Sequence, residues 1–435
     1  MRTRILALLA AAALALAGPG VSRPTTATAA TSLPSCSARH WVASWTAVPT
    51  DAVASQPPVE QTFRIRVVPH RRGTVARLRF SNRFGTGPVT LGAVTLAAQQ
   101  AGARLDPATL RTVTFDGRRQ VRIARGGDVV SDPVRIRVRA FHPLLASIYV
   151  VGSPGPASQH VLSGQTTWQS APLSGNRTRT LGAGGFIGLP VAGVAPAIPQ
   201  GIPYLSGFDV RADHRVGTVV AFGDSITDGF QGSLAPVNPV ATNIDLDARY
   251  PDVLSRRILR AGIGLSVVNA GISGNQLLRK ASVPIFGPSG LSRLGRDGLG
   301  QPGATTVILL EGINDIGQSA AKPADLIAGY RTAIERAHAR GLRILLGTLT
   351  PDEGTLQPGY GTLAEAARTA VNAWIRRQRV ADGVVDFDRA VRDPAHPARI
   401  LPAYDGGDHL HFSPAGYRAM ARAVPLATLA RPRCR

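Results

Sequence analysis

The sequence of 435 residues predicts an all-β sandwich or jelly roll followed by an α/β domain, a three-layer α/β/α sandwich around a five-stranded parallel sheet. Residues 36–205 alternate apolar and polar side chains with a period of two, as half-buried strands do. Residues 215–432 carry short apolar runs separated by stretches of helical period, as a doubly wound parallel sheet does. A chain of this length is also long enough for more than one domain.

Residues 1–30 are predicted to be a secretory signal peptide that belongs to neither domain. Arg2 and Arg4 precede an apolar run, 5–17, and Ala27-Thr28-Ala29 offers a small-residue cleavage site. The apolar run has about 13 residues, whereas a membrane-spanning helix needs roughly 20. We therefore expect a secreted, extracellular protein.

The two cysteines, Cys36 and Cys434, lie near the two ends of the secreted chain. Because export leads to an oxidising compartment, we expect them to form a disulfide that joins the two ends. The alternative is a pair of free thiols.

The first predicted domain is recognised by its alternating segments. The clearest of them are residues 63–67, 75–80, 134–138 and 146–150. Turn-forming clusters such as Arg71-Arg72-Gly73 separate these segments, and helical periodicity is nearly absent. This pattern favours an antiparallel β-sandwich or jelly roll. Rows of arginine on its outward faces predict either weak association with anionic surfaces or simply a solvated face.

A Gly/Pro/Ala-rich stretch, 181–203, is predicted to connect the two domains. Beyond it, five apolar runs have the length of buried strands: residues 218–222, 265–269, 305–310, 344–348 and 384–387. Helical periodicity lies between and after them, near residues 250–261, 324–340, 363–380 and 414–424. Short buried strands that alternate with helices predict a parallel sheet.

In a parallel α/β sheet, ligands bind outside the carboxyl ends of the strands, so the loops after the strands are the places to look for chemistry. Ser225 directly follows the first strand, in a turn flanked by glycine. A hydroxyl held on such a rigid support suits a nucleophile. A helix cap formed by Asp224 or Ser225 is the alternative for this stretch alone.

The loops after the second and third strands offer hydrogen-bond donors. Gly274 allows a backbone N–H to approach a ligand closely, and Asn314 can present side-chain N–H groups to the same crevice. A glycine turn without a ligand, and a helix cap, are the alternatives at these two positions.

A candidate base follows the fifth strand. Asp408 and His411 are three residues apart, which allows the carboxylate to hold one ring nitrogen while the other faces outward. His409 is the rival base, but its adjacency to Asp408 makes that geometry harder. A metal site built from Asp408, His409 and His411 is the competing chemistry, although no second acidic or histidine cluster completes a coordination shell.

Four sequence blocks together resemble those of the GDSL or SGNH hydrolase superfamily, in that family's order. They are Gly223-Asp224-Ser225-Ile226, residues 269–274, Gly312-Ile313-Asn314-Asp315 and Asp408-His409-Leu410-His411. The resemblance implies a flavodoxin-like SGNH fold in which Ser225 is the nucleophile, His411 the base and Asp408 its partner. It also implies an oxyanion hole formed by the backbone N–H groups of Ser225 and Gly274 with the side chain of Asn314.

Residues 81–85 and 310–317 further resemble a secreted two-domain bacterial subgroup, similar to xylanase-associated arylesterases or acylhydrolases, that carries an N-terminal β-sandwich. Phe412 departs from the proline that many family members have after the histidine. Thr227 takes the place of the second glycine in the Gly-x-Ser-x-Gly elbow of α/β-hydrolases.

We therefore expect a secreted serine esterase that acts on carboxylic esters, with short acyl (acetyl) esters on carbohydrate as the preferred substrates. A lipase or phospholipase-type acylhydrolase, and an inactive glycan-binding protein, are the alternatives. The expected reaction requires no metal and no other cofactor. We expect a monomer whose partner is its ester substrate, an acylated polysaccharide or a lipid.

Nucleic acid is not an expected partner, despite a net charge of +22. Nearly all of the positive charge is arginine, since Lys280 and Lys322 are the only lysines. With abundant Ala, Gly and Pro, this composition is typical of a GC-rich genome, and no nucleic-acid motif accompanies it.

Overall fold

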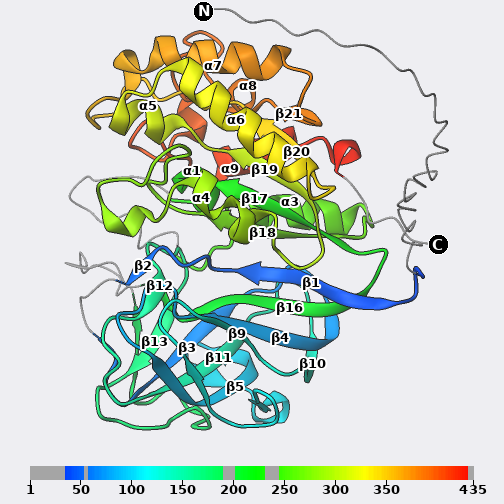
Figure 1. Cartoon of the computed structure of the whole chain (residues 1–435), viewed down its shortest axis with the longest axis vertical. Helices are drawn as coiled ribbons and strands as arrows, with labels where there is room; N and C mark the ends of the chain where they lie inside the picture. Colours follow the sequence, from blue (N-terminus) through cyan, green and yellow to red (C-terminus); the bar gives the residue numbers. More distant parts are fainter. Residues whose placement is uncertain (1–34, 53–56, 190–200, 231–243, 430–435) are drawn as a thin grey trace, which may run out of the picture. The chain divides into compact units, whose positions relative to one another are not determined.

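A computed structural model describes residues 35–52, 57–189, 201–230 and 244–429, which belong to one compact unit (Figure 1). The predicted signal peptide and Cys434 lie outside these residues, so the peptide and the disulfide stay predictions. Within the described ranges, no helix is long and apolar enough to cross a membrane.

The first half of the described chain is all β, as predicted, and is built on antiparallel pairing. One sheet has the order β1-β16-β4-β10, with β9 paired to β4. Its strands are β1 (Arg39–Thr46), β16 (Leu205–Asp213), β4 (Gly73–Ser81), β10 (Val134–Val138) and β9 (Asp128–Val130). Strand β16 begins at Leu205, where the sequence predicts that the first domain ends, and continues to Asp213.

A second sheet has the order β14-β13-β3-β11-β5-β6, with β7 and β8 paired to β5. Its strands are β14 (Phe186–Leu189), β13 (Thr167–Ser170), β3 (Gln61–Val67), β11 (Leu144–Val151), β5 (Val89–Ala101), β6 (Arg104–Leu105), β7 (Arg111–Val113) and β8 (Val121–Ile123). A small sheet joins β15 (Ile202–Pro203), β12 (Ser158–His160) and β2 (Asp51–Ala52). Strand β14 falls in the predicted connector, where its high glycine content hides the strand pattern.

The two larger sheets share one apolar core, because alternate residues of their strands point inward. In β10, Val134, Ile136 and Val138 are buried, while Arg135 and Arg137 are exposed. Period-two alternation therefore produces both the core and the arginine-bearing outer face.

The second half contains the predicted parallel sheet of five strands, in the order β18-β17-β19-β20-β21. The strands are β17 (Gly217–Gly223), β18 (Leu265–Gly271), β19 (Ala304–Leu310), β20 (Arg343–Gly347) and β21 (Gly383–Val385). This is the flavodoxin-like order, in which the chain reverses direction across the sheet between β17 and β19. The three-layer arrangement stays a prediction.

Helices connect these strands or follow them. They are α1 (Ser225–Asp228), α3 (Tyr250–Arg260), α4 (Gly290–Arg293), α5 (Ile313–Ser319), α6 (Pro323–His338), α7 (Glu365–Arg377), α8 (Phe387–Val391) and α9 (Pro414–Ala423). Short turns of 3₁₀ helix lie at η1 (Pro107–Thr109), η2 (Pro284–Phe286), η4 (Gly361–Leu363), η5 (Pro402–Tyr404) and η6 (Leu426–Thr428), and η3 (Leu294–Gly298) is a π-helix.

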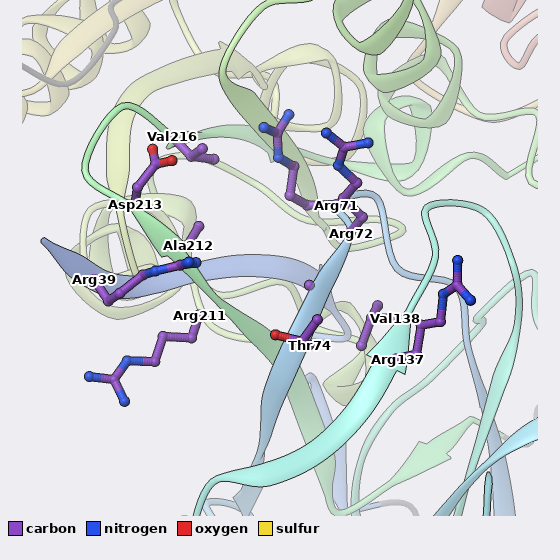
Figure 2. A pocket seen from close by; sticks show the side chains of 11 residues that line it. Arg39, Arg71, Arg72, Thr74, Arg137, Val138, Arg211, Ala212, Asp213 and Val216 are labelled. Carbon is purple, nitrogen blue, oxygen red and sulfur yellow. The ribbon is translucent and has the colours of Figure 1, made fainter. Parts of the chain in front are cut away.

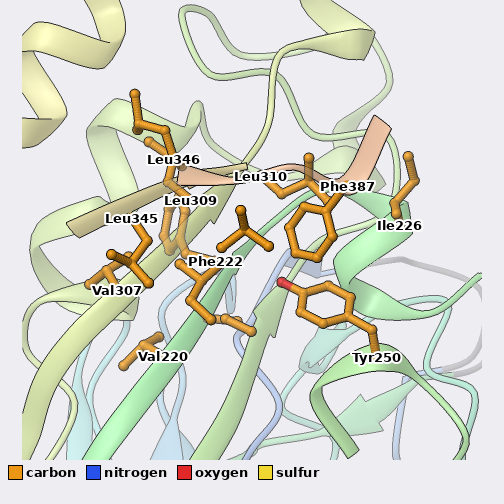
Figure 3. Packing of buried hydrophobic residues seen from close by; sticks show 14 of the residues in the cluster. Val220, Phe222, Ile226, Tyr250, Val307, Leu309, Leu310, Leu345, Leu346 and Phe387 are labelled. Atoms are coloured by element: carbon orange, nitrogen blue, oxygen red, sulfur yellow. The ribbon is translucent and has the colours of Figure 1, made fainter. Parts of the chain in front are cut away.

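The central strands are buried on both faces, which explains why they are continuous apolar runs and not alternating ones. Phe222 at the end of β17 lies in a cluster with Leu309 of β19 and Leu345 of β20 (Figure 3). The rings of Tyr250 and Phe387 pack 5.2 Å apart in the same cluster. This core fixes the positions at which the strands end, and with them the loops that follow.

The all-β half contacts the edge of the parallel sheet through buried polar groups. Strand β1 lies against β18, and Thr46 Oγ1 donates to the carbonyl oxygen of Asn269 at 2.5 Å. His70 Nδ1 lies 2.7 Å from the carbonyl oxygen of Val267, and its Nε2 lies 3.1 Å from Asp252 Oδ1. Arg249 Nε donates to the other Asp252 oxygen at 2.7 Å. Burial opposes ionisation, but Arg249 and His70 hold the pKa of Asp252 below its usual range.

We expect Asp252→Asn to lower the free energy of unfolding by about 3 kcal/mol, because it leaves the largely buried Arg249 without its carboxylate. Urea unfolding at neutral pH measures the change. Asp325→Asn, at an exposed position in the first turn of α6, is the matched control and should cost less than about 1 kcal/mol. Equal losses in the two variants would contradict a role for the buried ion pair.

Candidate active site

Ser225 begins helix α1 directly after β17, so its hydroxyl lies at the carboxyl end of the central sheet. Asp224 caps the helix, because its Oδ1 accepts a hydrogen bond from the Ile226 N–H at 3.0 Å. A Cβ at Gly223 would lie 2.1 Å from the carbonyl oxygen of Leu310, so only glycine allows the turn to pass this close to β19. The serine is therefore held at a fixed position.

Ser225, His411 and Asp408 form one hydrogen-bonded chain. His411 Nε2 lies 2.8 Å from Ser225 Oγ, and His411 Nδ1 lies 2.6 Å from Asp408 Oδ2. The other Asp408 oxygen accepts from the backbone N–H groups of Leu410 and His411. Burial opposes ionisation of Asp408, but these hydrogen bonds and the His411 ring lower its pKa to about 2. An ionised Asp408 holds the Nδ1 proton, which leaves Nε2 to accept the serine proton.

The rival base His409 lies apart from this chain. Its Nδ1 is 2.5 Å from Asp405 Oδ2, and its side chain is 53% exposed. Across the described ranges, no three His, Cys, Asp or Glu side chains gather as a metal site would require. His409 therefore pairs with Asp405 instead of joining Asp408 and His411.

Asp224 is the other carboxyl close to Ser225. Burial raises its pKa to about 7, and its Oδ2 has no hydrogen-bond partner among the described residues. Its capping bond to Ile226 identifies it as a residue that shapes the turn.

The predicted donors of the oxyanion hole line the same cavity as Ser225. Gly274 has a φ of +75°, and a Cβ there would lie 2.3 Å from the Phe286 ring. Asn314 Nδ2 donates to the carbonyl oxygen of Asn275 at 2.8 Å, while its Oδ1 accepts from the Tyr360 hydroxyl at 2.7 Å. Tyr360 thus fixes the orientation of the amide, and the second N–H of Nδ2 stays available for a ligand.

Arg293 is a buried residue that sequence reasoning missed, and it joins two of the site loops. Its guanidinium donates to the carbonyl oxygens of Gly223 at 2.8 Å and Ala270 at 2.7 Å, and to Asn275 Oδ1 at 2.7 Å. It therefore fixes the end of β17 against the loop that carries Gly274. No motif marks this arginine among the many in the sequence.

His160 links the all-β half, through Asp228, to the loop that carries Ser273 and Gly274. Its Nδ1 lies 2.8 Å from the Val48 carbonyl oxygen, and its Nε2 lies 3.2 Å from Asp228 Oδ1 in α1. Asp228 Oδ2 in turn accepts from the backbone N–H and the hydroxyl of Ser273. Burial opposes protonation, but Asp228 raises the pKa of His160 above its usual value. His160 is therefore a buried, hydrogen-bonded histidine that contacts both halves.

The cavity beside Ser225 has a volume of about 550 Å³, within the range typical of small-molecule sites. Leu162, from the all-β half, forms part of its wall together with Val283 and Phe286. The Phe230 ring packs edge-on against His411, with 4.7 Å between ring centres. The remaining lining residues are Ser273, Gly274, Ser282, Asn314, Gln318, Gln357, Pro358, Tyr360 and Leu410. The arrangement places a hydroxyl, an imidazole and N–H donors in a cavity with both apolar and polar walls.

Among the solved structures that match about half of this chain are two esterases. The native aryl esterase of M. smegmatis is 18% identical, with 48% of this chain and 96% of that chain covered at a TM-score of 0.38. A carbohydrate acetylesterase family member from Sinorhizobium meliloti is 17% identical, with 48% and 95% covered at a TM-score of 0.39. No curated protein matches the sequence.

The model of the GDSL-like Lipase/Acylhydrolase family matches residues 221–419. This range begins within β17, just before Ser225, and ends within α9, just after His411. It therefore includes the three hydrogen-bonded residues Ser225, His411 and Asp408. It also includes the predicted oxyanion donors Gly274 and Asn314. The chain carries a GDSL-like lipase/acylhydrolase domain over residues 221–419.

Proposed function

We propose that the protein is a secreted serine esterase that hydrolyses carboxylic esters through an acyl-enzyme on Ser225. The observation that carries the proposal is the hydrogen-bonded chain from Ser225 through His411 to Asp408, at the wall of a cavity large enough for an ester. A hydroxyl, an imidazole and a carboxylate in this order are the groups that acyl transfer requires.

In the first half of the reaction, Ser225 Oγ attacks the ester carbonyl carbon while its proton moves to His411 Nε2. The carbonyl oxygen becomes an oxyanion, which the backbone N–H groups of Ser225 and Gly274 and the Asn314 amide stabilise. The tetrahedral intermediate collapses, the bond to the alcohol oxygen breaks, and His411 returns its proton to the leaving alcohol. Ser225 is then esterified by the acyl group.

In the second half, water replaces the alcohol. His411 takes a proton from the water as its oxygen attacks the acyl carbon, and the same donors stabilise the second oxyanion. Collapse of this intermediate releases the carboxylic acid, and the proton on His411 returns to Ser225 Oγ. Asp408 stays ionised throughout and stabilises the imidazolium.

Short acyl esters on carbohydrate are the substrates we favour. The resemblance to xylanase-associated arylesterases supports them, and this subgroup assignment is part of the proposal. A lipid acylhydrolase is the second candidate, favoured by the apolar wall of Leu162, Val283 and Phe286, which suits a longer acyl chain. An inactive glycan-binding protein is disfavoured, because Ser225, His411 and Asp408 are all present and hydrogen-bonded.

A series of p-nitrophenyl esters of rising acyl length tests the function and separates the two candidates. We expect kcat/KM to be highest for acetate or propionate and to fall steadily toward dodecanoate. A maximum at dodecanoate would instead support the lipid acylhydrolase. Ser225→Ala is the control and should lower kcat by several orders of magnitude. Near-normal turnover by this variant would end the proposal.

We expect Asn314→Ala to lower kcat by roughly 10²–10³ with little change in KM, because an oxyanion donor acts mainly in the transition state. Tyr360→Phe is the matched comparison, since it removes only the hydroxyl that orients the Asn314 amide. The kcat of Tyr360→Phe should fall less, by about tenfold at most. Steady-state kinetics on p-nitrophenyl acetate measures both changes. A larger effect of Tyr360→Phe than of Asn314→Ala would contradict the assignment.

We expect Asp408→Asn to lower kcat by roughly 10³–10⁴, because the amide cannot hold the His411 tautomer as the carboxylate does.

The pKa of Asp408 is lowered from 3.8 to about 2 on folding, so its ionisation stabilises the folded state above about pH 4. That contribution, on the order of 1–2 kcal/mol, disappears as pH falls through the folded pKa.

Urea unfolding of the wild type and of Asp408→Asn at pH 6 and pH 3 measures this effect on stability. The difference in unfolding free energy between the two proteins should shrink at the lower pH. A difference that grows as the pH falls would contradict the assigned direction of the pKa shift.

A further inference from the structure

A second hollow, of about 360 Å³, lies beyond the start of β17, whereas Ser225 follows the end of that strand. Five arginines line it, and they come from four segments far apart in the sequence (Figure 2). They are Arg39 at the start of β1, Arg71 and Arg72 in the turn before β4, Arg137 in β10 and Arg211 in β16. The fold therefore gathers positive charge that the sequence disperses.

Nearby carboxylates compensate the charge of these arginines only in part, through the attraction of Asp213 for Arg39 and Arg71. Among the described residues, no ion pair or side-chain hydrogen bond is formed by any of the five guanidinium groups with an acid. Asp213 is the acidic residue that lines the hollow, and its ion pair, at 3.2 Å, is with Arg215. Burial and repulsion by Arg72 lower the pKa of Arg71, and the attraction of Asp213 only partly offsets them.

Other arginines of the all-β half form ion pairs with carboxylates of the protein. Arg66 donates to both oxygens of Asp247 at 3.1 Å and 2.8 Å. Arg77 and Arg79 share the buried carboxylate of Asp209. The arginines of the hollow are therefore available to bind an external anion, and they differ from other unpaired arginines in that they line one hollow.

The shape and composition of the hollow indicate which class of anionic ligand it can bind. Its arginines are spread around it, which suits a ligand with several separated negative charges better than a single ion (Figure 2). No aromatic residue lines it, so nucleic-acid bases would find no stacking surface. The exposed large hydrophobic side chains of the described chain lie elsewhere, so membrane insertion has no anchor here.

We propose that this hollow binds a segment of acidic polysaccharide through the carboxylate groups of successive sugar residues. Guanidinium groups bind carboxylates through paired hydrogen bonds, and several such contacts along one chain add in affinity. The site is separate from the cavity at Ser225 and does not depend on ester hydrolysis. It would hold an anionic polymer on the all-β half while the other half acts on ester groups.

The test measures binding of polygalacturonate to the full-length secreted protein by isothermal titration calorimetry, with neutral dextran as the uncharged comparison. The variant Arg72→Gln/Arg211→Gln changes two exposed arginines of the hollow. The matched control, Arg118→Gln/Arg119→Gln, removes the same charge from an exposed turn outside the hollow. We expect the first variant to bind at least tenfold more weakly and the control to bind within twofold of wild type.

Equal weakening in both variants would overturn the site, because net charge alone would then explain binding. Unchanged binding in the first variant would overturn it too, as would tighter binding to phosphatidylglycerol vesicles than to polygalacturonate. Monomeric galacturonate that binds as tightly as the polymer would contradict an extended ligand. Ser225→Ala should bind polygalacturonate as wild type does, and both arginine variants should hydrolyse p-nitrophenyl acetate normally. These two results distinguish a failure of the proposed polysaccharide site from a failure of the proposed esterase function.

Discussion

One buried guanidinium, that of Arg293, holds the active-site end of the parallel sheet together. Its three nitrogens all donate hydrogen bonds, to the ends of β17 and β18 and to the side chain that follows Gly274. It also lies 3.9 Å from the centre of the Phe222 ring and 3.7 Å from Glu311 Oε1. A buried cation is costly unless it is paired and hydrogen-bonded, so these contacts favour the arrangement of the loops that provides them.

The all-β half contributes directly to the proposed active site. His160 braces Asp228, which in turn holds Ser273 beside Gly274, and Leu162 forms part of the cavity wall. Buried contacts such as Thr46 to Asn269 fix the two halves to each other. The N-terminal half is therefore a structural part of the cavity beside Ser225, and its arginine hollow gives it a proposed binding surface of its own.

That the residues of the candidate site lie together could be predicted from sequence, because each of them follows a predicted strand or lies in a short motif. Ser225, Gly274, Asn314, Asp408 and His411 all have such local signals, and the parallel sheet brings them together. Arg293, Tyr360 and His160 have none, since their roles depend on contacts with residues tens of positions away or more. The arginine hollow was missed for the same reason. Period-two alternation predicts that arginines face outward, but it does not predict which of them meet.

We propose that His411 activates Ser225 as a nucleophile. Labelling with a fluorophosphonate, followed by mass spectrometry of the digested protein, tests it most directly, because this reagent reacts with activated serines. We expect one label per chain, on the peptide that contains Ser225, and at least a hundredfold slower labelling in His411→Ala. Stoichiometric labelling of a different serine, or labelling of Ser225 at the same rate in His411→Ala, would contradict it.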